Sequence, residues 1–366
     1  MNMNIRDILQ EEWSNIFVNN WKNNNKKGIL NLFQRTGKIR TTLLIIEKLK
    51  LQNKKILICY PDNKIKDSWI NDIKKFNINL TNVTYTNISS LKKYKDEYFD
   101  LFIWDECHSF SEKQSEIVQE IIKSGSETVI GLSGTISNTT KDELKLLYNL
   151  DIFIKYGLKN AIEDGLISDY EINIIKVPLD SSVLKKNKKG KFVSEKRQYD
   201  DYTNVIDRLR RANKSTMFLN LQRNRILQKS ISKLNKLKEL IKNPGRFVIF
   251  TGLTEVADSL GIPSYHSKSK DLSAINDFKD EKIDKLALAV TGGIGVTYNN
   301  LDGVILSNFT YDQEETSQIL ARSLMLDYHN KVAKIYIITS SEPAELKKLE
   351  STLVDFEPSK IKYVNN

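Results

Sequence analysis

The chain has 366 residues, of which 40% are hydrophobic and 28% charged, and its formal net charge is +10. This length suits two domains of about 150 to 200 residues, and the hydrophobic content excludes a disordered chain. The charge favours a polyanionic partner, but a lysine excess is also what an A/T-rich genome encodes, so charge alone does not decide the partner.

The two cysteines, Cys59 and Cys107, lie inside apolar strand-like runs. We therefore expect neither a disulfide framework nor a metal cluster, and we expect a reducing, intracellular and cytoplasmic location. The N-terminal stretch MNMNIRDILQEEW lacks an apolar signal region. No run reaches the roughly 18 apolar residues of a membrane span, so no membrane partner is expected.

Short apolar runs alternate with helical patterns in the first half of the chain. The strand candidates are residues 28–33, 55–60, 83–86, 101–104 and 128–133, and the helical patterns between and after them are 38–51, 64–76, 115–124 and 142–150. This alternation predicts a parallel sheet with crossover helices.

A second alternating set follows residue 246. Its strand candidates are 246–252, 286–290, 302–308 and 333–339, and its helical patterns are 275–280, 317–325 and 343–356. The polar, aperiodic stretch 184–202 has the profile of a loop or linker, and a long basic helical stretch, 216–243, follows it. We therefore predict two similar α/β domains, 1–180 and 205–366, joined by a charged segment, 181–204.

A phosphate-binding loop is one interpretation of FQRTGKIRTT, residues 33–42, which follows a predicted buried strand and opens a helix. Backbone N–H groups and the helix dipole attract phosphate oxygens at such a place. Gly37 would allow a close backbone approach, and Lys38 would reach the β and γ phosphates. Taken alone, the TGK letters are better explained as an ordinary turn with a lysine at the start of a helix.

The pair Asp105 and Glu106 directly follows the apolar run 101–104, at the carboxyl end of a predicted strand. Ligands of open α/β sheets bind at this edge. In a nucleotide site the first carboxylate can hold Mg²⁺ through water and the second can orient the attacking water. The alternative is a solvated acidic turn.

WDECHSF (104–110) resembles motif II of the superfamily-two helicases and translocases, the DEAD/DEAH-box relatives. GLSGTISN (131–138) resembles motif III of the same family. The resemblance implies that Ser133 and Thr135 couple the nucleotide state to domain closure through His108. Capping of the following helix is the structural alternative for Ser133 and Thr135.

Further family motifs follow in order. IRDILQEEW (5–13) resembles the adenine-recognition element, with Gln10 as the contact. CYPDNKIKDSW (59–69) and TYTNISSL (84–91) are similar to motifs Ia and Ib, which hold a strand by its phosphates. The nucleic-acid contacts that these two motifs imply are Tyr60, Pro61, Lys64 and Thr86.

In the second half, FVIFTGLTEVADSL (247–260) resembles motif IV and SYHSKS (264–269) the strand and loop after it. AVTGGIGVTYNNLDGVIL (289–306) is similar to a Swi/Snf-type motif V, and QILARSLMLD (318–327) to motif VI. An ordinary hydrogen-bonded histidine and an ordinary amphipathic helix are the alternatives for His266 and Arg322. The implied nucleic-acid contacts are Thr251, Gly252, His266 and Thr291, and the implied nucleotide contacts are Gly295, Gln318 and Arg322.

The resemblance covers more than 300 residues and implies two tandem RecA-like, doubly wound parallel-sheet domains. It also implies ATP and Mg²⁺ as ligands, and hydrolysis that drives movement on DNA or RNA, with DNA favoured. The compact form is similar to small phage or viral helicases, which would act in the host cytoplasm. The nucleotide-binding residues of the loop would be Arg35, Thr36, Gly37, Lys38, Ile39 and Arg40.

Three positions depart from the family pattern. Arg35 replaces the first glycine of the loop, which some Swi/Snf-like members tolerate. Ile39 replaces the hydroxyl residue that coordinates Mg²⁺, and Met325 replaces the second arginine of motif VI. Losing one arginine can slow phosphoryl transfer strongly, so a nucleotide-gated binding module without sustained hydrolysis is the alternative function. Thr36, Thr41 or a second water are the candidate substitutes for the missing hydroxyl.

Overall fold

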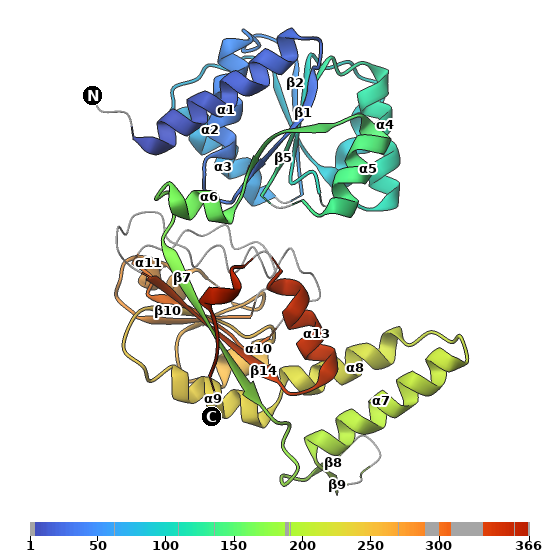
Figure 1. The fold of residues 1–366 in the computed structure, drawn as a ribbon, viewed down its shortest axis with the longest axis vertical. Helices are drawn as coiled ribbons and strands as arrows, with labels where there is room; N and C mark the ends of the chain where they lie inside the picture. Colours follow the sequence, from blue (N-terminus) through green and yellow to red (C-terminus); the bar gives the residue numbers. More distant parts are fainter. Residues whose placement is uncertain are drawn as a thin grey trace. The chain divides into compact units, whose positions relative to one another are not determined.

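The computed structural model describes residues 4–61, 63–108, 110–134, 136–186, 190, 192–269, 271–289, 300–308, 332–354 and 356–364. The chain divides into two compact units, unit 1 (Met1–Ile167) and unit 2 (Ser168–Asn366). Each unit contains one parallel sheet with helices packed on its faces, as the sequence predicts (Figure 1). Among the helices in the described part of the chain, none is both long and apolar enough to cross a membrane.

The sheet of unit 1 has the strand order β3-β2-β4-β5-β1-β6, and every pairing is parallel. Its apolar strands are buried because helices cover both faces. Helices α1 to α3 lie on one face and α4 and α5 on the other (Figure 1). The strands are β1 (Lys27–Leu32), β2 (Ile56–Tyr60), β3 (Val83–Asn87), β4 (Leu101–Asp105), β5 (Thr128–Ser133) and β6 (Asp151–Tyr156). The helices are α1 (Ile5–Lys22), α2 (Lys38–Lys48), α3 (Asn63–Lys75), η1 (Ile88–Tyr94), α4 (Glu112–Ser124), α5 (Asn138–Tyr148) and α6 (Leu158–Glu163).

The sheet of unit 2 has the order β11-β12-β10-β13-β14-β7-β15 and is also parallel throughout its described pairings. Its strands are β7 (Asp169–Val177), β10 (Phe247–Phe250), β11 (Ser264–Tyr265), β12 (Lys285–Leu288), β13 (Gly303–Leu306), β14 (Val332–Ser340) and β15 (Ile361–Val364). Its helices are α7 (Glu195–Arg211), α8 (Met217–Gln228), α9 (Ile231–Leu240), α10 (Thr254–Asp258), α11 (Ser273–Lys279), α13 (Pro343–Thr352) and η2 (Pro358–Lys360). Strands β8 (Lys185–Lys186) and β9 (Phe192–Val193) form a separate antiparallel pair.

The division between the units differs from the predicted boundary near residue 180. Strand β7 pairs with β14 in register from Asp169 to Val177, so this segment belongs to the second sheet. This strand is not among the strands predicted from the sequence, because its partner β14 lies more than 150 residues further along the chain. The predicted linker 181–204 is also shorter in the structure: α7 begins at Glu195, where the Ser194 side chain accepts a hydrogen bond from the N–H of Arg197 (3.3 Å).

Candidate functional site

The loop between β1 and α2 adopts a conformation that requires its glycine. Gly37 has φ +105° and precedes the first residue of α2. A Cβ atom at Gly37 would lie 1.9 Å from Nε2 of Gln10, so a larger residue would displace that side chain. Arg35 is also left-handed, with φ +65°. The glycine identified in the sequence is therefore needed for both the backbone angle and the close packing.

The start of α2 suits an anion. The N–H of Thr41 donates to the Gly37 carbonyl (2.9 Å), which is the first hydrogen bond of the helix, so the preceding first-turn N–H groups have no partner within the helix. Nε2 of Gln10 donates to the Thr36 carbonyl (2.9 Å) and holds the loop against α1. Such a helix start can bind phosphate oxygens. Gln10 is buried, and its role as an adenine contact stays a prediction.

Two loop positions have other contacts. The Arg40 guanidinium lies 4.2 Å from the centre of the Phe76 ring and 3.8 Å from a carboxylate oxygen of Glu47, so it packs along the side of α2. The hydroxyls of Thr36 and Thr41 donate to the carbonyls of Phe33 (2.7 Å) and Gly37 (3.1 Å), and both threonines are buried. Each hydroxyl oxygen keeps its lone pairs, so the role of Thr36 or Thr41 as a substitute for the hydroxyl that Ile39 lacks stays a prediction.

Lys38 and the acidic pair meet at the carboxyl edge of the sheet. Nζ of Lys38 lies 2.9 Å from Oε1 of Glu106, although β5 separates the strands that precede the two residues. Both side chains keep some exposure, 13% for Lys38 and 17% for Glu106. Burial disfavours the charged form of Lys38, but Glu106 and Asp105 outweigh it and hold the pKa of Lys38 above its usual value. Lys38 is therefore a cation at neutral pH.

Asp105 is held by two donors. One oxygen accepts the indole N–H of Trp69 (2.9 Å) and the other the N–H of Glu106 (3.0 Å). Burial raises the pKa of Asp105 to about 6, against the opposing charge of Lys38, so the carboxylate is still mostly ionised at pH 7. Trp69 ends the segment 59–69 that resembles motif Ia. It is fully buried, but its N–H also orients Asp105, which spacing alone could not indicate because the pairing is tertiary.

Glu106 itself has a left-handed backbone, with φ +51°. This conformation costs a non-glycine residue about 1–2 kcal/mol. It occurs where the chain leaves β4, and the next N–H, that of Cys107, donates to the Leu132 carbonyl of β5 (3.0 Å). Strain of this kind is common at functional sites, where it aims a side chain.

His108 connects the acidic pair to β5. Its Nδ1 lies 2.7 Å from Oγ of Ser133 and 3.4 Å from Oε2 of Glu106. The predicted contact between His108 and Ser133 is thus present, and their role in coupling stays a prediction. Thr135, the second predicted coupling residue, lies outside the described residues.

The predicted nucleic-acid contacts of unit 1 lie at the ends of β2 and β3. The Asn87 side chain donates to the Pro61 carbonyl (2.7 Å) and ties the two strand ends together. Tyr60 and Thr86 are buried, at 3% and 4% exposure, so their side chains are not offered to a strand in this arrangement. The side chain of Lys64 lies outside the described part of the chain.

The predicted nucleic-acid contacts of unit 2 that the structure describes are bonded to, or packed against, neighbouring residues. Thr251 is buried and its hydroxyl donates to the Leu253 carbonyl (3.0 Å). A Cβ atom at Gly252, whose φ is +69°, would lie 2.0 Å from the side-chain nitrogen of Asn308.

His266 also has local partners. Its Nδ1 accepts the N–H of Lys268 (3.2 Å), so Nε2 carries the proton and donates to Asp258 (3.1 Å). These contacts are those of the structural alternative, a hydrogen-bonded histidine. The remaining predicted residues of unit 2 lie outside the described residues; they are Thr291, Gly295, Gln318 and Arg322. Met325, which departs from the family pattern, also lies outside them.

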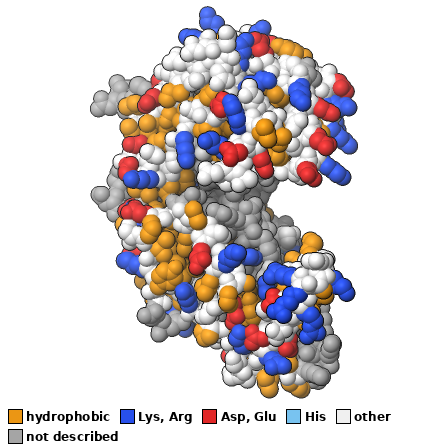
Figure 2. Space-filling model, turned by 45° about the vertical axis from the view of Figure 1, so that its right-hand side comes forward, with side chains coloured by type: hydrophobic (Ala, Val, Ile, Leu, Met, Phe, Trp, Pro, Cys, Tyr) orange, Lys and Arg blue, Asp and Glu red, His pale blue; other side chains and the backbone are white. Residues whose placement is uncertain are grey.

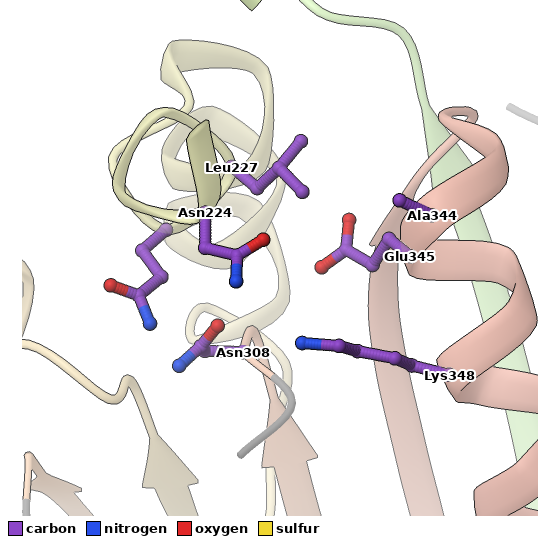
Figure 3. Close-up of a pocket in the computed structure, with 7 residues that line it drawn as sticks. Asn224, Leu227, Asn308, Ala344, Glu345 and Lys348 are labelled. Atoms are coloured by element: carbon purple, nitrogen blue, oxygen red, sulfur yellow. The ribbon is translucent and has the colours of Figure 1, made fainter. Parts of the chain in front are cut away.

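A small polar pocket lies at the carboxyl end of β13 in unit 2. Figure 3 shows Lys348 extending from α13 toward Asn308, with Asn224 of α8 beside them. Glu345, on the same wall, forms an ion pair with Lys233 of α9, and both side chains are almost fully buried (4% and 2%). The second oxygen of Glu345 accepts the N–H of Ser340 (2.8 Å). The end of α8 lines this pocket together with Asn308 at the end of β13, the neighbour of the strand that precedes Thr251 and Gly252.

Comparison with known proteins relates this site to restriction-enzyme subunits. Residues 2–138 match the ResIII family, described as the res subunit of type III restriction enzymes. A type I restriction enzyme EcoAI endonuclease subunit from Escherichia coli is 26% identical over an alignment of 183 residues, and the match covers 43% of this chain and 22% of that protein. The chain thus spans about a fifth of the length of this relative.

Two solved structures share the fold over almost the whole chain. The ATP-dependent type ISP restriction-modification enzyme LlaBIII, bound to DNA, has a TM-score of 0.62 at 13% identity and covers 98% of this chain, which spans 31% of LlaBIII. S. cerevisiae Dbp5, bound to RNA and ADP BeF3, has a TM-score of 0.56 at 10% identity, with 93% of this chain and 85% of Dbp5 covered. At these identities the likeness establishes the fold alone. The tandem RecA-like fold is confirmed, and the ResIII match agrees with the predicted family over residues 2–138. The likeness to phage or viral helicases stays a prediction.

Proposed function

We propose that this chain, whose residues 2–138 form a ResIII helicase domain of superfamily two, is an ATP-driven motor that moves along nucleic acid, DNA in preference to RNA. One observation carries the proposal: Lys38 of the glycine loop lies 2.9 Å from Glu106, beside Asp105, although the lysine and the acidic pair come from separate segments. A phosphate-binding lysine and an acidic pair at one sheet edge form the arrangement that phosphoryl transfer requires. DNA is favoured because LlaBIII, which shares the fold, is described as bound to DNA.

In the proposed site, each residue has a distinct task. The first-turn N–H groups of α2 and the ammonium of Lys38 would bind the phosphates, in place of the present contact with Glu106. Asp105, oriented by Trp69 and the N–H of Glu106, would hold Mg²⁺ through water. The metal would supply neutralisation of the developing phosphate charge.

Glu106 would orient the attacking water once Lys38 has turned to the phosphates. Its second oxygen lies 3.4 Å from His108, which contacts Ser133 at the end of β5. A change of the phosphates would therefore alter the position of Glu106, and the contacts Glu106–His108 and His108–Ser133 would transmit it to the end of β5. By resemblance, Gln318 and Arg322 would stabilise the charge that develops during transfer.

A nucleotide-gated binding module is the second candidate function. It is favoured by Ile39, whose side chain has no oxygen for the metal. In this case the chain would bind nucleotide and nucleic acid without sustained turnover.

Phosphate release from ATP, measured with and without single-stranded DNA or RNA, separates the two functions. For the motor, DNA raises the rate, and Lys38→Ala lowers it by about 10²–10³-fold because a phosphate-stabilising charge is lost. Lys48→Ala is the matched control on the same helix, since Lys48 pairs with Glu11 of α1 (2.7 Å) and should leave the rate unchanged. Nucleotide binding with release no faster than in Lys38→Ala would instead establish the binding module.

A further inference from the structure

Helices α7 and α8 form a hairpin that projects from unit 2 (Figure 1). None of the family motifs lies on it, so the proposed nucleotide chemistry does not account for it. The two helices are joined by a short turn that begins after Arg211 and ends before Met217. We define the hairpin tip as residues 205–221.

Side-chain contacts join the two helices of the hairpin. The guanidinium of Arg223 lies 5.5 Å from the centre of the Tyr199 ring and donates to the side chains of Asn220 (3.2 Å) and Thr203 (3.5 Å). Ile206 is completely buried. At the base, Leu179, Tyr199 and Leu227 form a separate apolar cluster. These contacts join α7 to α8 and join the base of the hairpin to the segment that follows β7.

Cations dominate the tip. The four basic side chains Arg208, Arg210, Arg211 and Lys214 are all exposed, and the single carboxylate within the tip is that of Asp207, 4.0 Å from Arg210. The C-terminal dipole of α7 accounts for some preference for cations in its last turn. It does not account for Lys214, which lies beyond the helix.

Large apolar side chains are exposed beside these cations. Met217 is 74% exposed and Phe218 65%, and Val205 and Leu221 are about 40% exposed. Figure 2 shows Lys and Arg side chains gathered with hydrophobic ones on the lower right of the molecule, where the hairpin projects. A single exposed apolar residue needs no explanation, but four around one cationic turn indicate a contact surface.

Single-stranded nucleic acid fits this combination of groups. Three of the four cations are arginines, whose planar forks bind phosphate oxygens through two hydrogen bonds. An exposed aromatic ring beside a cationic track is the arrangement that stacks unpaired bases. Helix α8 also runs from the tip to Asn224 and Gln228, which line the pocket with Asn308 at the carboxyl end of β13. Motif IV is predicted to contact a strand at that same sheet edge, so the two surfaces are joined by one helix.

We propose that the hairpin tip is an additional binding site for single-stranded nucleic acid, in which the four cations bind backbone phosphates and Phe218 stacks on an unpaired base. The site rests on the proposed function, because it assumes that the chain acts on nucleic acid. It adds a contact outside the helicase motifs, and it predicts a preference for unpaired over fully paired strands.

The test is the affinity for a fluorescein-labelled oligodeoxythymidylate, measured by fluorescence anisotropy over a series of salt concentrations. Replacing Arg208, Arg210, Arg211 and Lys214 together with Ala should weaken binding at least about tenfold at low salt. It should also reduce the slope of log affinity against log salt by about 3, since each phosphate contact on a single strand contributes about 0.7. Phe218→Ala should weaken binding about fivefold or more and leave the slope unchanged, because stacking releases no counterions.

Matched variants control for charge and exposed apolar area. Replacing the exposed lysines Lys113, Lys123 and Lys141 of α4 and α5 with Ala removes surface charge elsewhere, and Leu146→Ala removes an 84% exposed apolar side chain from α5. These variants should bind as the natural chain does. The DNA-independent rate of phosphate release should be unchanged in the tip variants, and thermal melting confirms that each is folded.

The outcomes separate this proposal from the proposed function. If DNA stimulates the natural chain and the tip variants bind with unchanged affinity and slope, the hairpin site is wrong and the motor stands. If the natural chain neither binds nor responds to DNA, both fail. If the tip variants lose binding to phosphatidylserine vesicles but bind DNA as the natural chain does, the tip binds a membrane surface and the proposal is wrong. If Phe218→Asp abolishes self-association and leaves DNA binding unchanged, the tip binds a second copy of the chain and the proposal is again wrong.

Discussion

Each unit places a lysine–glutamate ion pair at the carboxyl edge of its parallel sheet, but the two pairs differ in burial. In unit 1, Lys38 and Glu106 keep 13% and 17% exposure. In unit 2, Lys233 and Glu345 keep 2% and 4%, and the partners of Glu345 include the N–H of Ser340 in the last residue of β14. The first pair is open to a ligand and the second is sealed in the protein.

The comparison shows that an ion pair at a sheet edge does not by itself indicate a site. Glu106 has a left-handed backbone and connects through His108 to the neighbouring strand, so its position is strained and linked to other polar groups. Glu345 lies in the first turn of α13 and fastens that helix to the end of β14. A buried pair that fixes an element is structural, whereas a partly exposed pair can exchange its partner for a substrate.

The largest effect is expected from breaking the sealed pair. Glu345→Gln leaves the buried ammonium of Lys233 without a counter-charge, which should lower the free energy of unfolding by about 3–5 kcal/mol. Chemical denaturation followed by circular dichroism measures this change. The exposed pair Lys229–Glu255 provides the control: Glu255→Gln should change the same quantity by less than about 1 kcal/mol.

A double variant sharpens this prediction. Lys233→Met combined with Glu345→Gln removes the uncompensated charge and keeps an acceptor for the N–H of Ser340. Most of the lost stability should return. A double variant as unstable as Glu345→Gln alone would show that packing, and not charge, holds the pair.

Breaking the partly exposed pair Lys38–Glu106 should affect activity more than stability. Glu106→Gln should change the free energy of unfolding by about 1 kcal/mol or less, because Lys38 remains partly solvated. The rate of ATP hydrolysis should fall by about 10²–10⁴-fold, because the carboxylate that orients water is lost. Denaturation and phosphate release on the same preparation test both statements, and a large loss of stability with unchanged hydrolysis would make this pair structural too.

The smallest effect is expected at Ile39. Ile39→Thr supplies a hydroxyl at the start of α2 and should lower the Mg²⁺ concentration for half-maximal hydrolysis about two- to tenfold, the value of one polar contact. Ile39→Val has the same β-branched shape without the hydroxyl and should have no effect. An equal response of the two variants would exclude a metal role for this position.

The sequence indicated that Lys38 and the acidic pair would lie at one edge of the first sheet, where the structure places them. Strand-then-glycine-loop and strand-then-acidic-pair patterns are local, and the carboxyl ends of parallel strands must share one edge, so Lys38 and Glu106 could be expected to approach each other. The sequence did not predict strand β7, because its partner β14 is distant in the chain. It also did not predict the hydrogen bond from Trp69 to Asp105, because this bond joins α3 to β4.

By itself, the sequence determined two α/β units and the residues gathered at one edge of the first sheet, because periodicity and motif spacing are properties of neighbouring residues. Only the tertiary structure decided which polar side chains stay accessible. Thr86, Thr251 and His266 carry suitable groups, yet the fold buries the two threonines and bonds the histidine to Asp258 and Lys268. Burial and hydrogen-bond partners depend on segments far apart in the chain, and no local pattern encodes them.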